Sequence, residues 1–497
     1  MVAPVDKSPS HLDYILGVKC THCGLFKSLY ELKERSGTIF EYSCERWDGG
    51  EFVPVLDMDR LRPILDPHIA HIAGKERDVA QERFKTHPSY FIFPELLPLI
   101  WDHGKPRIYV EDIPFSPLDK STKIGHELGV SQLYFLDDGR LLTGSFKDRA
   151  VNMAVNITKE SGCYTTIYNA STGNLVIACL EIGAKAGMDV YALLPQALSE
   201  GKRKKIEEVV QAVRKYGHTV KVSYFDHDYT TINDTIAERL IDDHNNGKEF
   251  LEAFSPNRGP RTWYGMGEWT AAFQLVTQLY YQHGIERGVP INIYIGGGSG
   301  KLTSMVTEAC KVLQELHILD NPIRVWSVQP DIHQPLVEGY NTQVLPKLQQ
   351  GLTYEDIKDD LNLVIGKNPQ GTIVEEVAIK TPGSFLHTMK SLAHPNFLGE
   401  WKWKDIRGGA VAIKDETTID GLVELALKEG LTPQFVGAMA YQGFRQVVEQ
   451  HPELKEEIHL VYLTGGGKGK MHPTLEEMAR NGSFGKSEEL LKISPLF

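Results

Sequence analysis

Short runs of apolar and β-branched residues alternate with runs of helical periodicity between residues 164 and 225. The expected strands and helices follow one another as 164–168, 175–186, 190–194, 202–216 and 219–225. Residues 175–186 are apolar on every side, which is typical of a buried helix, and Gly187 and Gly217 stand where the two helices are expected to end. Because each helix carries the chain back to the edge where the next strand begins, this order predicts a parallel sheet.

The same alternation returns in the second half of the chain. We expect strands at 291–295, 323–328 and 458–463, and the one-sided apolar pattern of 305–313 predicts a helix after the first of them. The pattern predicts an α/β protein and divides the chain into several parts. These are an N-terminal extension at 1–105, a large domain at 106–160 and 250–472, a small mobile domain at 161–249 and a C-terminal tail at 473–497.

One lysine lies in a turn directly before a helical pattern. Residues 143–149 read Thr-Gly-Ser-Phe-Lys-Asp-Arg, and apolar residues at helical spacing follow Lys147. A turn that enters a helix N-terminus favours an anion or a reactive group. A lysine held there can form a Schiff base, and pyridoxal 5'-phosphate (PLP) is the main cofactor that needs one. Because a single lysine at a helix start is usually a solvated side chain, the hypothesis needs support from other parts of the chain.

A polar loop joins the expected strand 164–168 to the buried helix. It carries Ser171, Thr172, Gly173 and Asn174. Their hydroxyl and amide groups, beside the free N–H groups of a helix start, suit a carboxylate. Taken alone, the same residues also suit an ordinary helix N-cap.

A glycine-rich loop follows the expected strand 291–295. It consists of Gly296, Gly297, Gly298, Ser299 and Gly300. Glycines let backbone N–H groups surround a phosphate at a helix N-terminus. Ile295 and Leu302 stand where a nucleotide-binding P-loop has glycine and a hydroxyl residue. The loop therefore favours one phosphate monoester, such as that of PLP, over ATP or GTP.

Thr464 opens a third glycine-rich stretch after the expected strand 458–463. The residues that follow it are Gly465, Gly466, Gly467, Lys468, Gly469 and Lys470. P-loop spacing is again absent, because Thr464 stands where glycine is needed and Met471 where serine or threonine is needed. Taken alone, the stretch also suits a flexible turn.

Composition narrows the class of protein. A length of 497 residues suggests about three domains, and 41% hydrophobic with 24% charged residues is typical of a soluble globular protein. A net charge of −12 disfavours a nucleic-acid partner, and the chain has no apolar run of about 18 residues that would span a membrane. Residues 1–10 lack the basic and apolar blocks of a signal peptide. The six cysteines show no disulfide framework, which favours a reducing, cytoplasmic location.

The motifs, in this order, resemble the fold-type II PLP-dependent enzymes, and within them the threonine synthase and cysteate synthase group. Four motifs agree in order and spacing, and the resemblance covers roughly residues 106–472. It implies a tryptophan synthase β-like fold, with two doubly wound parallel-sheet domains behind an N-terminal cysteine-knuckle extension. It also implies an amino-acid substrate and a homodimer.

The resemblance assigns a role to each motif. Lys147 would hold PLP covalently, Asn174 would contact the ring hydroxyl, and residues 296–300 would bind its phosphate. Ser171, Thr172 and Gly173 would grip the substrate carboxylate. Thr464 stands where threonine synthases place a hydroxyl that faces the pyridine nitrogen.

A phosphorylated substrate would also need a cationic cradle. The cations in or beside the motifs are Arg149, Lys301, Lys468 and Lys470. We take Arg149 and Lys468 as candidate substrate-binding residues. Each of these side chains is as well explained by a solvated surface charge.

The chain departs from the family at two points, and both keep alternatives open. Leu175 and Val176 stand where the family usually has Thr-Gly, and the Gly-Gly-Gly-Lys run after Thr464 looks more like cysteate synthase. The leading interpretation is a threonine synthase-like lyase that converts O-phosphohomoserine and water to threonine and phosphate. The alternatives are a cysteate synthase-like replacement on O-phosphoserine with sulfite, a lyase or synthase in specialised metabolism that uses an unphosphorylated amino acid, and a catalytically silent homologue that binds a partner.

Three cysteines near the N-terminus form a knuckle. Cys20 and Cys23 have Cys-x2-Cys spacing and Cys44 follows, and both resembled enzymes can begin in a similar way. A zinc ribbon would need a fourth ligand near position 47, where this chain has Trp47. This favours a degenerate, metal-free ribbon over bound zinc. Metal analysis of protein purified without chelator tests the prediction, and zinc near one equivalent would overturn it.

Overall fold

The computed structural model describes most of residues 14–466. The residues between these limits that it leaves out of the description are 37–43, 45–50, 73–74, 87–88, 100, 103–104, 162–164, 172, 197, 199, 228–230, 233–234, 236–252, 255–260, 365–373, 375–381 and 394–407. Within the described part, no helix has the length and apolar character to cross a membrane.

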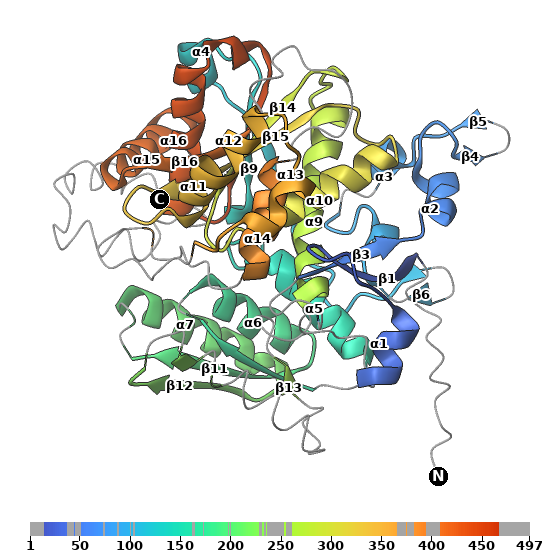
Figure 1. Ribbon diagram of the computed structural model, residues 1–497. Helices are drawn as coiled ribbons and strands as arrows, with labels where there is room; N and C mark the ends of the chain where they lie inside the picture. The colour runs from blue at the N-terminus through green and yellow to red at the C-terminus, as the bar shows by residue number, and fades with distance from the viewer. Residues whose placement is uncertain are drawn as a thin grey trace.

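A mostly parallel sheet forms the centre of the large domain (Figure 1). Its described strands lie in the order β16–β15–β14–β17–β9–β8. Their bounds are β8 Leu118–Lys120, β9 Leu133–Asp137, β14 Ile291–Gly296, β15 Ile323–Pro330, β16 Gly409–Ile413 and β17 Ile458–Leu463. Neighbours are parallel except at the edge, where β8 pairs antiparallel with β9. The expected parallel sheet is therefore confirmed apart from this edge strand.

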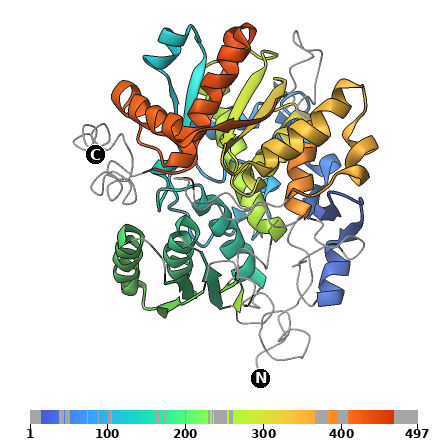
Figure 2. The same ribbon diagram turned by 60° about the vertical axis from the view of Figure 1, so that its left-hand side comes forward.

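Helices cover both faces of this sheet, as Figure 2 shows. The helices α9 (Arg261–Tyr281) and α10 (Lys301–Glu315) share a hydrophobic core with Ile291, Ile293 and Ile295 of β14. The helices α15 (Asp415–Glu429) and α16 (Phe435–Gln450) pack against the opposite face, where Tyr294 joins their core. Burial on both faces explains why every residue of β14 is buried, including the polar Asn292.

A second parallel sheet forms the small domain, which lies below the large one in Figure 1. Its described strands have the order β12–β11–β10–β13. Their bounds are β10 Thr166–Ala170, β11 Asp189–Pro195, β12 Val220–Phe225 and β13 Ala253–Phe254, and the connecting helices are α6 Asn174–Lys185 and α7 Glu200–Val213. Because β13 pairs with β10, this sheet includes residues that the prediction assigned to the large domain.

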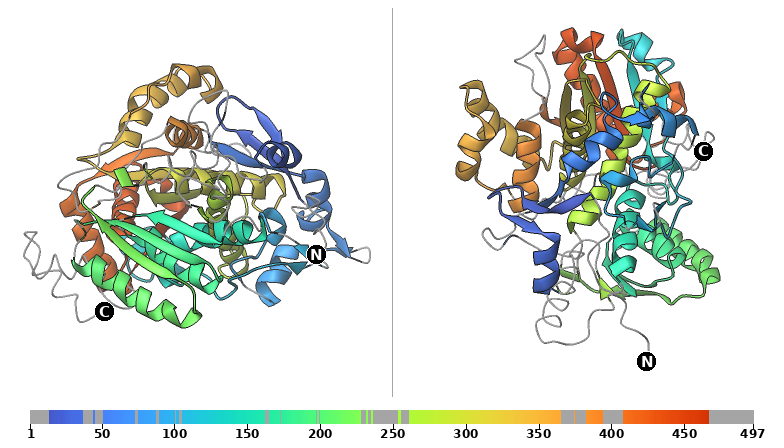
Figure 3. Two further views of the ribbon diagram at one scale, coloured as in Figure 1. Left: turned by 90° about the horizontal axis from the view of Figure 1, so that it is seen from below. Right: turned by 90° about the vertical axis from the view of Figure 1, so that its right-hand side faces the viewer.

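The N-terminal extension lies along one flank of both domains, as the two views of Figure 3 show. It contains an antiparallel sheet of order β2–β1–β3. Its main elements are β1 Ile15–Cys20, β2 Phe26–Ser28, α1 Leu29–Ser36, β3 Phe52–Leu56, α2 Met58–Leu65 and α3 Val79–Thr86. Thr262 Oγ1 on α9 donates to the carbonyl of Phe52 at 3.2 Å, so the extension packs directly against the large domain.

The remaining elements complete the described chain. They are β4 His71–Ile72, β5 Lys75–Glu76, η1 Pro94–Leu96, β6 Trp101–Asp102, β7 Lys105–Pro106, α4 Ile124–Leu128, η2 Asp138–Arg140, α5 Lys147–Ser161, η3 Arg214–Tyr216, α11 Pro335–Gly339, η4 Tyr340–Val344, α12 Leu345–Gln349, α13 Tyr354–Ile357, η5 Lys358–Asp360, α14 Pro382–Ala393 and η6 Pro452–Glu456. Of these, α5 and α14 contribute to the site described next.

Candidate active site

Lys147 is the first residue of α5 and is half-buried. Its Nζ lies 4.2 Å from the ring centre of Phe146 and 5.9 Å from that of Tyr264. Among the described residues, Nζ has no hydrogen-bond acceptor and no carboxylate in ion-pair contact. An amine that makes no salt bridge is sterically available for covalent attachment of a carbonyl cofactor.

The turn before Lys147 pairs with the glycine-rich stretch after β17. The backbone N–H of Phe146 donates to the carbonyl of Thr464 at 2.9 Å, and Ser145 forms a β-bridge with Gly465. Thr464 itself is 3% exposed. The third glycine motif therefore lies directly beside the lysine turn, although the two are more than 300 residues apart in the sequence.

Gln434 connects the small domain to this region. Its backbone N–H donates to the carbonyl of Gly465 at 2.7 Å. Asn174 Nδ2 donates to Gln434 Oε1 at 2.8 Å, and Gln434 Nε2 donates back to Asn174 Oδ1 at 3.2 Å. Val436, two residues later, contacts Gly296, since a Cβ on that glycine would lie 2.2 Å from Val436 Cγ1. The start of α16 thus brings the motifs together, and no sequence motif had pointed to Gln434.

The loop 297–300 leads from β14 into α10. Among the described residues, the N-cap glycines of α10 and α6 offer no side-chain cap, and the Lys301 N–H makes one long hydrogen bond, of 3.4 Å, to Ser299 Oγ. Gly300 has φ of +79°, and a Cβ on Gly297 would lie 2.4 Å from Ser327 Oγ. Uncapped helix starts leave backbone N–H groups free for an anion. The residues present therefore fit both the phosphate of PLP at α10 and a carboxylate at α6.

Three of the four site motifs stand directly at the carboxyl end of a strand. Ser171 and Gly173 follow β10, the loop 297–300 follows β14 and Thr464 follows β17. This is the edge at which open parallel sheets bind ligands. Thr172 and Lys468, together with Lys470, lie outside the described residues, so their predicted roles stay predictions.

Arg149 has a different role from the predicted one. Its side chain is fully buried and forms an ion pair with Asp138, with Nη2 to Oδ1 at 2.7 Å. Further hydrogen bonds reach Ser116, Thr270 and Gln274. Burial alone would lower the pKa of the guanidinium, but Asp138 raises it above its usual value. Because these partners enclose the guanidinium, we correct the prediction that Arg149 binds a substrate phosphate.

Lys301, another candidate for the phosphate cradle, is also occupied. Its Nζ lies 2.9 Å from Glu51 Oε2, and the two side chains are 13% and 6% exposed. Glu51 also accepts from Ser384 Oγ at 2.7 Å. The ammonium beside the glycine loop is therefore neutralised by a carboxylate from the N-terminal extension.

Glu268 on α9 is a site residue that sequence patterns did not indicate. It is fully buried, and burial raises the pKa of its carboxyl to about 7, against the opposing effect of the Lys147 and Lys301 ammonium groups. In the sequence it stands within the apolar helix pattern of 261–281, where a single acid gives no periodic signal.

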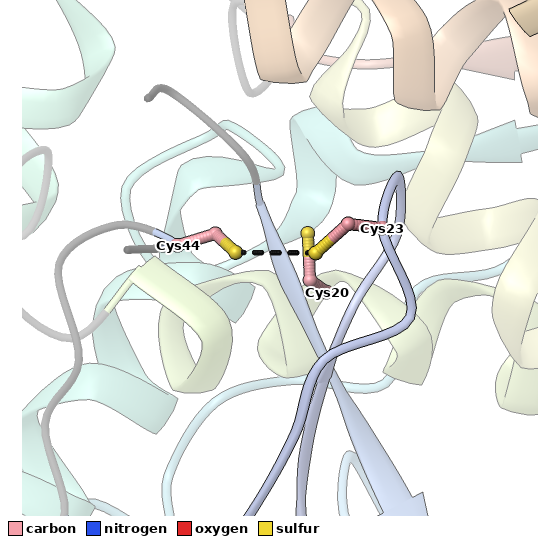
Figure 4. Close-up of side chains that lie close together, drawn as sticks. All are labelled: Cys20, Cys23 and Cys44. Carbon is pink, nitrogen blue, oxygen red and sulfur yellow. Dashed lines mark hydrogen bonds between the residues drawn. The ribbon is translucent and has the colours of Figure 1, made fainter. Parts of the chain in front are cut away.

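The three N-terminal thiols converge, as Figure 4 shows. The sulfur atoms of Cys20, Cys23 and Cys44 all lie within 4.8 Å of one another, and Cys23 and Cys44 are 3.4 Å apart at sulfur. Burial raises the pKa of Cys20 to about 11, which disfavours its thiolate when no cation is bound. Three of four zinc ligands would fit here, and position 47 lies outside the described residues. The metal-free ribbon stays a prediction.

The fold and the site define a PLP-dependent enzyme of fold type II. The chain belongs to the pyridoxal-phosphate dependent enzyme family, whose model matches residues 111–465. Its cofactor is PLP, as predicted. When bound, PLP acts as an electron sink for an amino acid, and Lys147, Asn174, residues 296–300 and Thr464 are the residues that would hold it.

Curated relatives refine the family. A threonine synthase of Methanocaldococcus jannaschii is 26% identical over 71% of this chain and 74% of its own length. A threonine synthase of Methanosarcina acetivorans is 23% identical over 90% of this chain and 91% of its own length. These relatives support the predicted resemblance to the threonine synthase group.

Solved structures support the fold. Threonine deaminase isoform 2 of Solanum lycopersicum aligns with a TM-score of 0.50 at 16% identity, over 77% of this chain and 88% of that one. Maize serine racemase aligns with a TM-score of 0.51 at 14% identity, over 75% of this chain and 94% of that one. At such identities the likeness concerns the fold alone, and it confirms the predicted fold class.

Proposed function

We propose that this protein is a threonine synthase-like lyase, which releases phosphate from O-phosphohomoserine and adds water to form threonine. The observation that carries the proposal is the Lys147 turn, whose amine has no salt-bridge partner among the described residues and which is paired by backbone hydrogen bonds to Thr464. The threonine synthases of Methanocaldococcus jannaschii and Methanosarcina acetivorans support the choice of reaction.

In this proposal Lys147 moves the protons. Its Nζ takes the proton from the Cα of the substrate as a general base, and the same amine can return a proton later in the cycle. The rings of Phe146 and Tyr264 limit the positions of that amine. The Thr464 hydroxyl is neutral, so it does not hold a positive charge on a pyridine nitrogen as a carboxylate would. This favours elimination and replacement over transamination.

The small domain would hold the substrate carboxylate. Ser171 and the uncapped start of α6 offer a hydroxyl and free N–H groups. The Asn174–Gln434 pair spans the two domains, so substrate binding at α6 would act on the position of both. Closure of this kind would exclude water from the reacting carbon until it is needed.

A second candidate is a reaction on an unphosphorylated amino acid. It is favoured because the cations near the site are already neutralised. Arg149 is paired with Asp138, and Lys301 is paired with Glu51. Leu175 and Val176 are buried apolar residues that offer no hydroxyl to a substrate. The cysteate synthase-like replacement acts on O-phosphoserine, so it needs a site for a substrate phosphate just as the leading proposal does.

Phosphate release tests these candidates. Purified, PLP-loaded protein would be offered O-phosphohomoserine, and separately O-phosphoserine with and without sulfite, with products identified by mass. Threonine with phosphate supports the proposal, and sulfite-dependent release from the serine ester replaces it with cysteate synthesis. No release from either ester by a protein with normal cofactor absorbance favours the unphosphorylated substrate.

Replacement of Lys147 by Ala tests the site itself. We expect loss of the visible absorbance of lysine-bound PLP and loss of turnover by at least about 10³-fold, since both attachment and the general base are removed. Retained turnover would disprove the assignment of Lys147. The homodimer stays a proposal that rests on the resemblance, and the cytoplasmic location stays a proposal that rests on the cysteine usage. Sedimentation of the purified protein tests the first.

A further inference from the structure

Glu268 is a buried acid without a visible structural purpose. Its side chain is fully buried on α9, and neither carboxyl oxygen has a hydrogen-bond partner among the described residues. Burying a carboxylate in this way is costly unless a cation compensates it. An unsatisfied buried acid in a native fold therefore indicates a functional or electrostatic role.

The charges that face Glu268 come from the elements around it. They are Lys147 at the start of α5, Lys301 at the start of α10, Glu51 of the N-terminal extension and Tyr462 of β17. Lys301 is already paired with Glu51, and Tyr462 donates its hydroxyl hydrogen to Asp138. Lys147 is the remaining cation, and it has no ion-pair partner among the described residues.

Lys147 lies beside the face of α9 that carries Glu268. Tyr264, one helical turn before Glu268, contacts Lys147 with its ring, and residues four apart on a helix share a face. Gly267 allows the close approach of α5, since a Cβ there would lie 2.2 Å from the carbonyl oxygen of Arg149. The acid is thus held toward the lysine by two packed helices.

We propose that Glu268 is the positioning residue that stabilises positive charge on the nitrogen of Lys147. The inference rests on the role proposed for Lys147 as the general base. When Lys147 takes the proton, the Cα–H bond breaks and an N–H bond forms. The electron pair of the C–H bond stays with the substrate, and one positive charge appears at Nζ. The ionised carboxyl of Glu268 compensates that charge electrostatically and undergoes no covalent change itself.

The acid has to be ionised to act. Because burial raises the pKa of Glu268 to about 7, the carboxyl is largely neutral below this pH and ionised above it. Activity that depends on Glu268 should therefore rise as the pH increases through about 7. The replacement Glu268→Gln keeps the shape of the side chain and removes the charge at every pH.

A pH titration of the visible absorbance of lysine-bound PLP tests the inference on the full-length holoenzyme. Compared with the wild type, E268Q should lower the midpoint for loss of the proton on the Lys147 nitrogen by about 1–3 pH units, the range for one nearby opposite charge. We also expect kcat to fall at least about tenfold, the rate factor for a loss of about 1.4 kcal/mol, with KM little changed. E268D, which keeps the charge, should restore most of both.

The control is Glu308→Gln on α10. Glu308 is a half-buried carboxylate paired with Lys311 and close to His387, and the charges that act on it come from these two residues. E308Q should keep the wild-type midpoint. A wild-type midpoint in both E268Q and E268D overturns the inference and leaves the role of Lys147 intact. A wild type without the visible band, or a band that survives in Lys147→Ala, overturns the proposed function instead.

Discussion

Arg149 and Asp138 form an ion pair that water does not reach. Both side chains are 0% exposed, with Nε to Oδ2 at 2.8 Å and Nη2 to Oδ1 at 2.7 Å. The pair joins the first turn of α5 to η2 just after β9. We infer that the pair holds the Lys147 turn in place.

We predict that Asp138→Asn destabilises the protein by about 3–5 kcal/mol, because it leaves the Arg149 guanidinium buried without a counter-charge. Urea unfolding at neutral pH measures the change. The control is Asp119→Asn, which removes an exposed partner of Arg140 at 3.3 Å and should cost at most about 1 kcal/mol. A stable D138N variant with a much higher KM for a phosphorylated substrate would restore Arg149 as a substrate ligand.

For single residues, the sequence predicted which side chain is reactive better than it predicted where neighbouring side chains point. The segment 143–149 indicated a reactive lysine, and within the described part of the chain its amine makes ring contacts but no ion pair. The same segment gave no sign that the side chain of Arg149, two residues after Lys147, turns into the core. Its acid partner is Asp138, which lies outside the segment, before the turn. Glu268 was missed for a related reason. An acid on a buried helix has meaning only when the neighbouring helices are known.

The glycine loop before α10 is an element that depends on one backbone conformation. Gly300 has φ of +79°, and a Cβ there would lie 2.2 Å from Thr388 Oγ1 on α14. Any side chain would therefore push the loop away from the N-terminus of α10. This is the place where we propose that the PLP phosphate binds.

We predict that Gly300→Ala weakens PLP binding at least about tenfold, equivalent to about 1.4 kcal/mol. A PLP titration followed by absorbance measures it. The control is Gly430→Ala, because Gly430 has φ of +69° and no described atom lies within 4 Å of the added Cβ. Both variants carry the same backbone strain of about 1–2 kcal/mol, so equal PLP affinities would contradict the phosphate site.

Elements with strong patterns were predicted closely. The strand expected at 458–463 is β17 itself, and the buried helix expected at 175–186 begins and ends one residue earlier as α6. The strand expected at 164–168 is Thr166–Ala170, because its polar start gave no sharp boundary. The residue pair that connects the motifs, Asn174 with Gln434, could not be predicted, since their contact depends on how two domains meet.

On the scale of the whole molecule, the N-terminal extension reaches the cofactor region through Glu51. This carboxylate accepts from Ser384 Oγ at 2.7 Å, faces His387 Nδ1 at 3.2 Å and pairs with Lys301 at the end of the glycine loop. Although burial opposes it, the Lys301 ammonium and His387 hold the pKa of Glu51 well below its usual 4.5. The sequence suggested an appended part, but not that one of its residues neutralises the lysine beside the loop.

We predict that Glu51→Gln destabilises the protein by about 3–5 kcal/mol at pH 7.5, because Lys301 is left buried without its counter-charge. An acid whose folded pKa lies below its unfolded value contributes stability above the unfolded value and loses that contribution as the pH falls. The difference between wild type and E51Q should therefore shrink as the pH falls below about 4.5. Urea unfolding at several pH values measures the difference.

The variant should also weaken PLP binding, because Lys301 begins α10 and a shift of its backbone alters the loop 297–300. Glu355→Gln is the matched control, since Glu355 is 55% exposed and pairs with Lys358 and Lys390 away from the loop. It should change stability by at most about 1 kcal/mol and leave PLP affinity unchanged. If E51Q lost stability and kept full PLP affinity, the extension would only brace the large domain. Loss of both would mean that the extension helps to form the cofactor site.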